Sequence, residues 1–262
     1  MIPPRVLTIG GSDSGGSAGI QADLKTYTAH HVFGLSVLTI VTAQNTVGVQ
    51  AAHLLPLDFI TAQWNAVWGD MGADVIKTGL LGRREVVEFV AAQVQANPVP
   101  LVVDPVLVNG QGQLIVAPDV IEAYRTLLFP LAHIVTPNLD EVTHLTGLVV
   151  TNVTEACHAA TRLVEMGARA ALVKGGHLSG PTKIDVLCDG QQMVELTAPT
   201  LPIENPHGVG CTFASAIAAQ LALGLSLVEA VQAAHAYLQG ALRGAQAWRL
   251  GRGRQPVRHW LP

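Results

Sequence analysis

The stretch VLTIGGSDSGGSAGIQADLKTYTA (residues 6–29) decides how the chain is expected to fold. Its first four residues are mostly apolar or β-branched, which predicts a buried strand over residues 6–9. A run of glycine and small polar residues follows, and then a segment of helical period that predicts a helix over residues 18–28. A strand joined to a helix by a glycine-rich loop is typical of the first part of a βαβ unit.

The same alternation continues along the rest of the chain. Short apolar runs predict further strands at residues 36–42, 75–78, 101–103, 134–136 and 170–173, and a hairpin at residues 184–188 and 193–197. Segments of helical period predict helices at residues 58–68, 84–95, 120–128, 138–145, 154–166, 212–223 and 227–247. This order predicts an α/β fold with a mainly parallel sheet. Because no segment has the composition of a flexible linker, we expect a single domain over residues 1–262.

The composition excludes several classes of protein. Of the 262 residues, 49% are hydrophobic and 13% are charged, and the formal net charge is -4. This balance gives no basic surface for nucleic acid or for anionic lipid. The sequence also lacks an uninterrupted apolar run of membrane-spanning length and the pattern of a signal peptide at its N-terminus. We therefore expect a cytoplasmic protein without a nucleic-acid or membrane partner.

Cysteine and arginine residues give no strong signal of their own. The three cysteines are far apart and lack CxxC spacing, which argues against a disulfide framework and a zinc site. The basic cluster near the C-terminus is interleaved with glycine, so a solvated tail is expected for Arg249, Arg252, Arg254 and Arg258.

The glycine-rich loop of residues 10–19 is the first candidate for a binding site. Ligands of open α/β sheets bind beyond the carboxyl ends of the strands, and glycines let the backbone come close to a ligand. The loop has no G-x-G-x-x-G motif for a dinucleotide, and the chain has no P-loop. Residues 15–19 match G-x-S-x-G, but Ser17 lies too far beyond its strand for the nucleophile of an α/β-hydrolase.

Residues 205–212 (NPHGVGCT) precede an apolar, alanine-rich segment of helical period. The glycines allow the N–H groups of Gly208, Val209 and Gly210 to point at one anion, and the helix dipole favours negative charge there. The dipole also favours the thiolate of Cys211, which could accept a proton from an attacking hydroxyl. A glycine-rich helix cap with a small buried residue explains the same segment equally well.

Polar residues at the other strand ends add weaker candidates. Lys174 before two glycines suits a phosphate contact, although a surface lysine fits as well. Asn138 and Glu141 suit either a capping box or a hard cation bound through water. Asp104 could add a carboxylate to that site or be an ordinary turn residue. The Gln44 amide could pair with an amino-substituted heterocycle or merely satisfy loop backbone.

Taken together, these residues resemble the ribokinase superfamily and, within it, the hydroxymethylpyrimidine/phosphomethylpyrimidine kinases of thiamin biosynthesis. The resemblance covers nearly the whole chain and rests on residues 10–25, 43–46, 77–79, 104–106, 136–141, 174–177 and 207–212. It implies a ribokinase-like three-layer sandwich, in which helices flank a central and mostly parallel sheet. It further implies ATP and Mg²⁺ as cofactors, a small pyrimidine as substrate, and a homodimer.

The resemblance also implies a role for each candidate residue. Gly208, Val209 and Gly210 would form the anion hole, with Cys211 in the place where most of the superfamily has an aspartate base. Lys174 would contact the ATP phosphates, and Gly208 and Gly210 would also belong to the cofactor site. Asn138 and Glu141 would help to hold Mg²⁺, with Asp104 near the metal. The pyrimidine would be held by Gln44 and Asp23 and by the backbone around Gly11 and Ala18.

Two departures from the family pattern stand in the sequence. A flap that usually contains Lys-Ser-Gly reads LVNGQG at residues 107–112, and two usual threonines are replaced by Pro206 and Val209. The expected function is ATP-dependent phosphorylation of 4-amino-5-hydroxymethyl-2-methylpyrimidine, and then of its monophosphate to the diphosphate. A pyridoxine or pyridoxal kinase of the cysteine type and a pyrimidine-binding relative without catalysis remain the alternatives, and Gln44 favours the aminopyrimidine.

Overall fold

The computed structural model describes residues 2–176, 180–203 and 205–260, and the chain forms two compact units. Residues 1–81 and 201–262 make up the first unit, and residues 82–200 make up the second. The single domain expected from the sequence stays a prediction. Within the described ranges, no helix is both long and apolar enough to cross a membrane.

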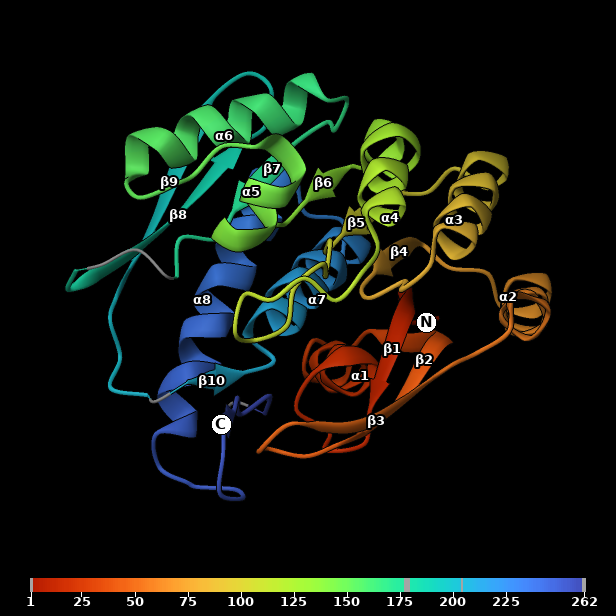
Figure 1. The fold of residues 1–262 in the computed structure, drawn as a ribbon, viewed down its shortest axis with the longest axis horizontal. Coiled ribbons are helices and arrows are strands. Elements are labelled where there is room, and N and C mark those ends of the chain that lie inside the picture. Colours follow the sequence, from red (N-terminus) through yellow and green to blue (C-terminus); the bar gives the residue numbers. More distant parts are fainter. Residues whose placement is uncertain (1, 177–179, 204, 261–262) are drawn as a thin grey trace. The chain divides into compact units, whose positions relative to one another are not determined.

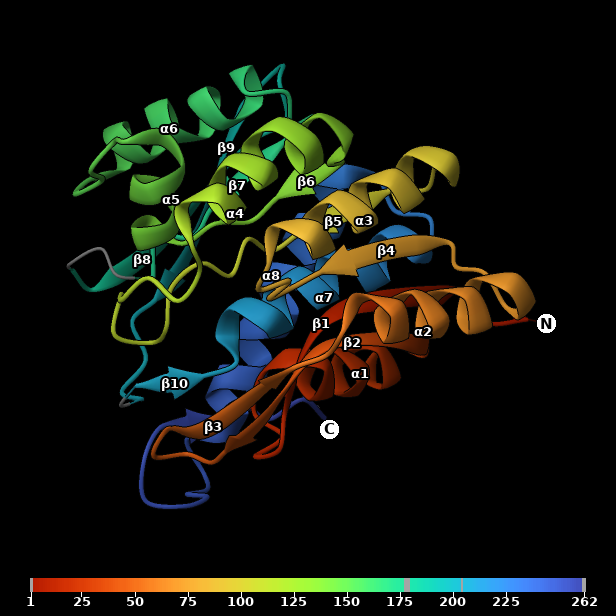
Figure 2. The same cartoon turned by 45° about the vertical axis from the view of Figure 1, so that its right-hand side comes forward.

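The first unit carries the strand order β3-β2-β1-β4 (Figure 1, red to orange). Its elements are β1 (Arg5–Asp13), α1 (Gly19–Ala29), β2 (Phe33–Gln44), β3 (Val49–Leu54), α2 (Leu57–Asp70), β4 (Val75–Thr78), β10 (Pro206–His207), α7 (Val209–Ala222), α8 (Leu227–Ala245) and β11 (Gln255–Pro256). Strand β1 runs parallel to both β2 and β4, whereas β3 is antiparallel to β2. Helix α7 packs against α1, β4 and α8, and α7 and α8 lie side by side in Figures 1 and 2.

Strand β1 continues four residues beyond its predicted end. We expected a strand over residues 6–9 because glycine weakens a strand. In the structure a register shift between Gly10 and Gly11 lets the chain stay paired with β2 as far as Asp13. A bulge of this kind bends a strand and re-aims the residues that follow it. The glycine-rich segment of residues 10–19 therefore belongs to β1 as far as Asp13 and leaves the strand after it.

The sequence analysis missed three strands of the first unit. All six residues of β3 are exposed, so the strand has no alternation of buried and exposed side chains from which it could be predicted. Strands β10 and β11 are two residues each and pair in parallel, Pro206 with Gln255 and His207 with Pro256. The expectation of a solvated C-terminal tail is wrong in part, because Arg254 is half-buried and Val257 and His259 are buried.

The second unit carries the strand order β5-β6-β7-β8-β9. Its elements are α3 (Arg84–Ala96), β5 (Leu101–Val103), α4 (Pro118–Ala123), a π-helical turn η1 (Tyr124–Leu128), a 3₁₀ turn η2 (Phe129–Leu131), β6 (Ile134–Val135), α5 (Leu139–Thr146), α6 (Val153–Glu165), β7 (Ala171–Val173), β8 (Thr182–Cys188) and β9 (Met193–Pro199). Strands β5, β6 and β7 are parallel and fully buried, and β8 and β9 form the predicted antiparallel hairpin. Helix α6 covers β7 and β8.

A buried ion pair lies in the core of the first unit. Lys77 of β4 and Asp23 of α1 are each only 1% exposed, and the Lys77 Nζ atom is 2.9 Å from Asp23 Oδ2. The hydroxyls of Thr8 in β1 and Ser215 in α7 also donate to the carboxylate, each at 2.6 Å. Because every oxygen of Asp23 has partners, the pair joins four elements by directional contacts.

We expect Lys77→Met to lower the free energy of unfolding by about 3–5 kcal/mol, because it leaves the Asp23 carboxylate buried without its cation. The double variant Asp23→Asn with Lys77→Met should lose less, because no charge stays unpaired. Arg84→Met removes the exposed pair with Glu88 and should cost less than about 1 kcal/mol. Urea unfolding at neutral pH measures all three, and equal losses for Lys77→Met and Arg84→Met would contradict the expectation.

Candidate functional site

Asp13, at the end of β1, organises the glycine-rich loop of the first unit. Its Oδ1 accepts a hydrogen bond from the N–H of Gly15 at 2.8 Å, and its Oδ2 accepts from those of Ser17 at 3.0 Å and Ala18 at 2.8 Å. Asp13 itself is buried. The sequence analysis did not select this residue. The available signal was an aspartate inside a run of glycine and serine, where its carboxylate tends to bind nearby backbone N–H groups.

The loop folds back so that two of the predicted substrate residues come together. Ser12 and Gly19 form an isolated antiparallel bridge, which brings the backbone after Ala18 alongside the end of β1 at Gly11. Gly19 has a φ of 57°, and a Cβ atom there would lie 2.3 Å from the Gly11 carbonyl oxygen. Only glycine fits this approach. The backbone segments around Gly11 and Ala18 therefore lie next to each other.

Gln44, the last residue of β2, lies beside this loop. Its backbone N–H donates to Ser14 Oγ at 2.8 Å, and Ser14 Oγ lies at the same distance from the Gln44 carbonyl. Its side-chain Oε1 is 3.2 Å from Thr42 Oγ1, and its Nε2 is 3.0 Å from Nε2 of His207. The Thr42 hydroxyl has one proton, and its nearer acceptor is the Ser12 carbonyl at 2.9 Å, so the contact with His207 is the firmer hold on the Gln44 amide. The amide has at least one donor and one acceptor position left for a ligand.

Helix α7 starts at Val209, three residues before its predicted start. Its cap, Gly208, has a φ of 81°, and a Cβ atom there would lie 1.8 Å from the Ser17 carbonyl oxygen. The predicted anion hole therefore packs directly on the front loop of the same unit. The first N–H groups of a helix have no partner within it, and those of Val209 and Gly210 belong to this turn. The half-buried Cys211 follows in the same turn.

Asp23 is the predicted substrate residue whose surroundings least suit that role. It is buried, and the Lys77 ammonium and two hydroxyls occupy its oxygens. The helix period puts it on the inner face of α1 rather than at the loop. Direct contact with a ligand is therefore not supported for Asp23, and holding α1 and α7 in place suits it better.

In the second unit, the predicted Lys174, Asp104, Asn138 and Glu141 form one cluster. Lys174 Nζ is 2.9 Å from Asp104 Oδ1, and Thr136 Oγ1 is 3.2 Å from the same oxygen. Residues 138 and 174 are joined by a parallel bridge, with the Lys174 N–H donating to the Pro137 carbonyl. Asn138 caps α5 in a full capping box, because Glu141 N–H donates to Asn138 Oδ1 at 2.9 Å and Asn138 N–H donates to Glu141 Oε2 at 2.8 Å.

This cluster has more negative than positive groups. Burial raises the pKa of Glu141 to about 7, Lys174 lowers it, and the Asp104 carboxylate raises it further. Burial also raises the pKa of Asp185 to about 6, although the N–H of Gly175 donates to it and Lys174 is near. Asp185 was not selected from the sequence, because an acidic residue inside a hairpin strand gives no distinct signal. Among the described residues, the carboxylates of Asp104, Glu141 and Asp185 thus lie near the Lys174 ammonium, and such a grouping favours a further cation.

The residues present fit a magnesium ion held mostly by water. Asp104 and Glu141 offer hard carboxylate oxygens, which Mg²⁺ prefers, and both are buried. Among the described residues no three His, Cys, Asp or Glu side chains form a ready ligand set. Such a site suits Mg²⁺, which keeps several waters and takes further oxygens from substrate phosphates.

The altered flap of residues 107–112 forms a closed turn. Asn109 Oδ1 accepts from the N–H groups of Gln111 at 2.9 Å and Gln113 at 3.0 Å, and the Asn109 N–H donates to the Gln113 carbonyl at 2.9 Å. A Cβ at Gly112, whose φ is 76°, would lie 3.3 Å from Asp140 Oδ2. The segment is therefore held by its own backbone in place of the usual Lys-Ser-Gly sequence.

The chain is similar to known proteins over nearly its whole length. The family model described as phosphomethylpyrimidine kinase matches residues 13–258. A hydroxymethylpyrimidine/phosphomethylpyrimidine kinase of Streptomyces coelicolor is 48% identical over 98% of this chain and 94% of the relative. An ADP complex of Bacillus subtilis pyridoxal kinase has a TM-score of 0.92 at 34% identity and 98% coverage of both chains. A phosphomethylpyrimidine kinase from Clostridium difficile has a TM-score of 0.80 at 37% identity, covering 90% of this chain and 97% of that one. The predicted ribokinase-like α/β fold is thereby confirmed.

Gly208→Ala is expected to lower the free energy of unfolding by about 3 kcal/mol, because a side chain there requires both a left-handed backbone and displacement of the Ser17 carbonyl. Gly48→Ala is the matched control. No atom lies within 4 Å of a Cβ at that exposed position, so its effect should stay within about 0.5 kcal/mol. Urea unfolding compares the two variants, and equal stabilities would mean that Gly208 does not lock the two loops together.

Proposed function

The chain belongs to the phosphomethylpyrimidine kinase family, and on that premise we propose that it phosphorylates 4-amino-5-hydroxymethyl-2-methylpyrimidine with ATP, and then the monophosphate to the diphosphate, in thiamin biosynthesis. One observation carries the choice of substrate. In the first unit, a Gln44 amide with one free donor and one free acceptor position lies beside the glycine loop that contacts the cap of α7.

Gln44 suits the edge of an aminopyrimidine. The 4-amino group donates a hydrogen bond and the adjacent ring nitrogen accepts one, which is the complement of a glutamine amide. In this proposal the ring lies against the backbone of Gly11 and Ala18, where small residues let it come close. Asp23 then acts by holding α1 in place, not by touching the ring.

The start of α7 suits the phosphoryl group in transfer. Backbone N–H groups of Val209 and Gly210 point outward from the first turn of a buried helix, whose dipole favours negative charge at that end. Donors that are fixed before the reaction stabilise developing charge without reorganisation. Pro206 has no N–H and contributes none.

The cluster of the second unit suits the phosphates of ATP. Lys174 would exchange part of its contact with Asp104 for phosphate oxygens, which it would bind as a compact positive charge. Asp104 and Glu141 would hold Mg²⁺ through water, and the bound ion would supply neutralisation of phosphate charge. Asn138 fixes the Glu141 carboxylate through the capping box.

Cys211 is proposed as the general base that takes the proton of the 5-hydroxymethyl group. It lies in the first turn of α7 and is half-buried. The helix dipole favours its thiolate, and a proton has to leave the hydroxyl as the new phosphate ester bond forms.

A pyridoxal kinase is the second candidate, because the Bacillus subtilis pyridoxal kinase has the same fold over 98% of this chain.

We further propose that the protein works as one domain and as a homodimer in the cytoplasm. The exposed edge strand β3 and the exposed apolar residues Val41, Val47 and Val49 beside it support a covered face in a dimer.

Purified protein with Mg·ATP should release ADP when 4-amino-5-hydroxymethyl-2-methylpyrimidine is added, and mass spectrometry should find the monophosphate followed by the diphosphate. Pyridoxine and a reaction without acceptor run beside it. Lys174→Met should lower kcat by about 100-fold or more, because the phosphates lose their fixed cation. If only pyridoxine is phosphorylated, the second candidate, a pyridoxal kinase, is favoured. If neither acceptor is phosphorylated, the kinase proposal is contradicted.

Cys211→Ala should lower kcat by about 10²–10⁴-fold with little change in KM for the pyrimidine, because a general base acts only in the transition state. Cys211→Asp should keep measurable turnover, since a carboxylate is also a base. Cys157→Ala, on α6, is the control and should behave as the wild type. Near-full turnover of Cys211→Ala would remove the thiol from proton transfer and leave it as a pocket-lining group.

A further inference from the structure

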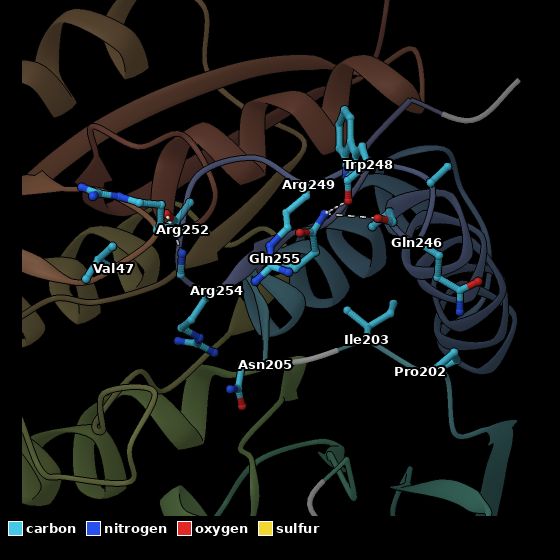
Figure 3. Close-up of a pocket in the computed structure, with 14 residues that line it drawn as sticks. Val47, Pro202, Ile203, Asn205, Gln246, Trp248, Arg249, Arg252, Arg254 and Gln255 are labelled. Atoms are coloured by element: carbon cyan, nitrogen blue, oxygen red, sulfur yellow. Dashed lines mark hydrogen bonds between the residues drawn. The ribbon is translucent and has the colours of Figure 1, made fainter.

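The C-terminal segment of residues 251–259, here named the C-terminal strap, contacts both loops of the first unit that the function uses. The backbone N–H of Arg254 donates to the Thr46 carbonyl at 2.8 Å, two residues after Gln44. One residue further on, the N–H of Gln255 donates to the Asn205 carbonyl at 3.3 Å, and β11 pairs with β10. The strap also lines a cavity of about 780 Å³ (Figure 3).

The Arg254 side chain holds the segment that leads into α7. Its guanidinium donates to the Pro206 carbonyl at 2.8 Å, and Figure 3 shows it pointing toward Asn205. Arg249 and Arg252 of the same region are exposed, in contrast to the half-buried Arg254. Partial burial of a guanidinium costs desolvation free energy, even when a carbonyl group is its fixed partner. The position of Arg254 is therefore a specific feature of the fold.

His207 connects Arg254 to Gln44. Its Nε2 is 3.0 Å from Gln44 Nε2 and 3.8 Å from Asp13 Oδ2. A glutamine NH₂ group only donates, so His207 Nε2 has to accept and the imidazole is neutral, with its proton on Nδ1. Burial and then the positive charge of Arg254 lower the pKa of His207, and Asp13 acts in the opposite direction.

We propose that Arg254 is a positioning residue that fixes the direction of the Gln44 amide, by holding the Pro206–His207 strand and by keeping the His207 imidazole a hydrogen-bond acceptor. With His207 accepting at Nε2, Gln44 directs its NH₂ toward the imidazole, and its Oε1 faces away from it, 3.2 Å from Thr42 Oγ1. The Oε1 atom can then accept from an amino group of the substrate. A protonated His207 would donate to Gln44 instead and would turn the amide over, so that an NH₂ group faced the substrate amine.

This assignment rests on the proposed role of Gln44 in binding the aminopyrimidine, but its first test does not depend on catalysis. The pKa of His207 is measured by NMR titration of its imidazole, assigned by comparison with His207→Asn. Arg254→Gln removes the neighbouring positive charge, so the pKa of His207 should rise by at least half a unit. Arg254→Lys keeps the charge and should restore the wild-type value. Arg252→Gln, an exposed arginine of the same region, is the control and should leave it unchanged.

The second test follows substrate binding in the same variants. Between the wild-type pKa of His207 and its raised value, Arg254→Gln should increase KM for the aminopyrimidine about 10-fold, with KM for ATP unchanged. Above the raised pKa, and below the wild-type pKa, where both proteins have His207 in the same state, the defect should shrink. Arg254→Lys should bind like the wild type. An unchanged pKa of His207, or a KM defect that does not vary with pH, overturns the proposal.

The two tests separate failure of this inference from failure of the proposed function. If the wild type phosphorylates no pyrimidine, the proposed function fails, and the His207 titration still supports or rejects the link to Arg254. If Arg254→Gln proves too unstable to titrate, the tautomer of His207 in the wild type decides. Nitrogen-15 shifts that show a neutral imidazole with its proton on Nδ1 support the proposal, and a protonated Nε2 at neutral pH overturns it.

Discussion

The arrangement of the first unit depends on one buried ion pair, between Lys77 of β4 and Asp23 of α1. Removing two charges from water costs several kcal/mol for each ion, and only excellent geometry with further hydrogen bonds offsets this cost. Thr8 and Ser215 provide those bonds, and they extend the contact to β1 and α7. These four elements carry the glycine loop and the proposed anion-binding turn. Directional contacts hold them in place in addition to apolar packing, which tolerates small shifts.

Charge is used differently in the two units. In the first, each buried charge near the proposed pyrimidine site is satisfied internally: Asp23 by Lys77 and two hydroxyls, and Asp13 by three backbone N–H groups. In the second, among the described residues, three carboxylates lie near the Lys174 ammonium, and burial raises the pKa of Glu141 to about 7. Internal satisfaction gives rigidity, whereas an excess of one charge attracts a ligand of the other. This difference fits a unit that shapes a neutral ring site and one that binds a metal and phosphates.

Much of the fold followed from the sequence, and the misses have physical causes. The buried parallel strands β4 and β5 were predicted to the residue. Strand β5 is a continuous apolar run, as expected for a strand buried on both faces, whereas β4 also contains Lys77, which is buried because it pairs with Asp23. The fully exposed β3 has no such pattern, and the start of α7 was placed late because its first turn is made of glycine and small residues. The candidate site residues chosen from the sequence are glycines and side chains at strand ends, and their roles stay predictions. Asp13 and Asp185 were missed, since each acts through contacts that only the folded backbone brings together.

Pro206 illustrates how the surrounding structure holds a residue that lacks a backbone N–H. Proline also brings no hydroxyl to the neighbourhood of the proposed anion site. A proline is tolerated in a strand only where its missing N–H is not needed, and β10 is a two-residue strand with a single partner strand, β11. The carbonyl of Pro206 remains, and Arg254 binds it at 2.8 Å. Since proline also fixes φ, the residue before His207 is held from both sides, by its own ring and by the guanidinium of the C-terminal strap. Rigid backbone and one charge-assisted hydrogen bond thus position the segment that leads into α7.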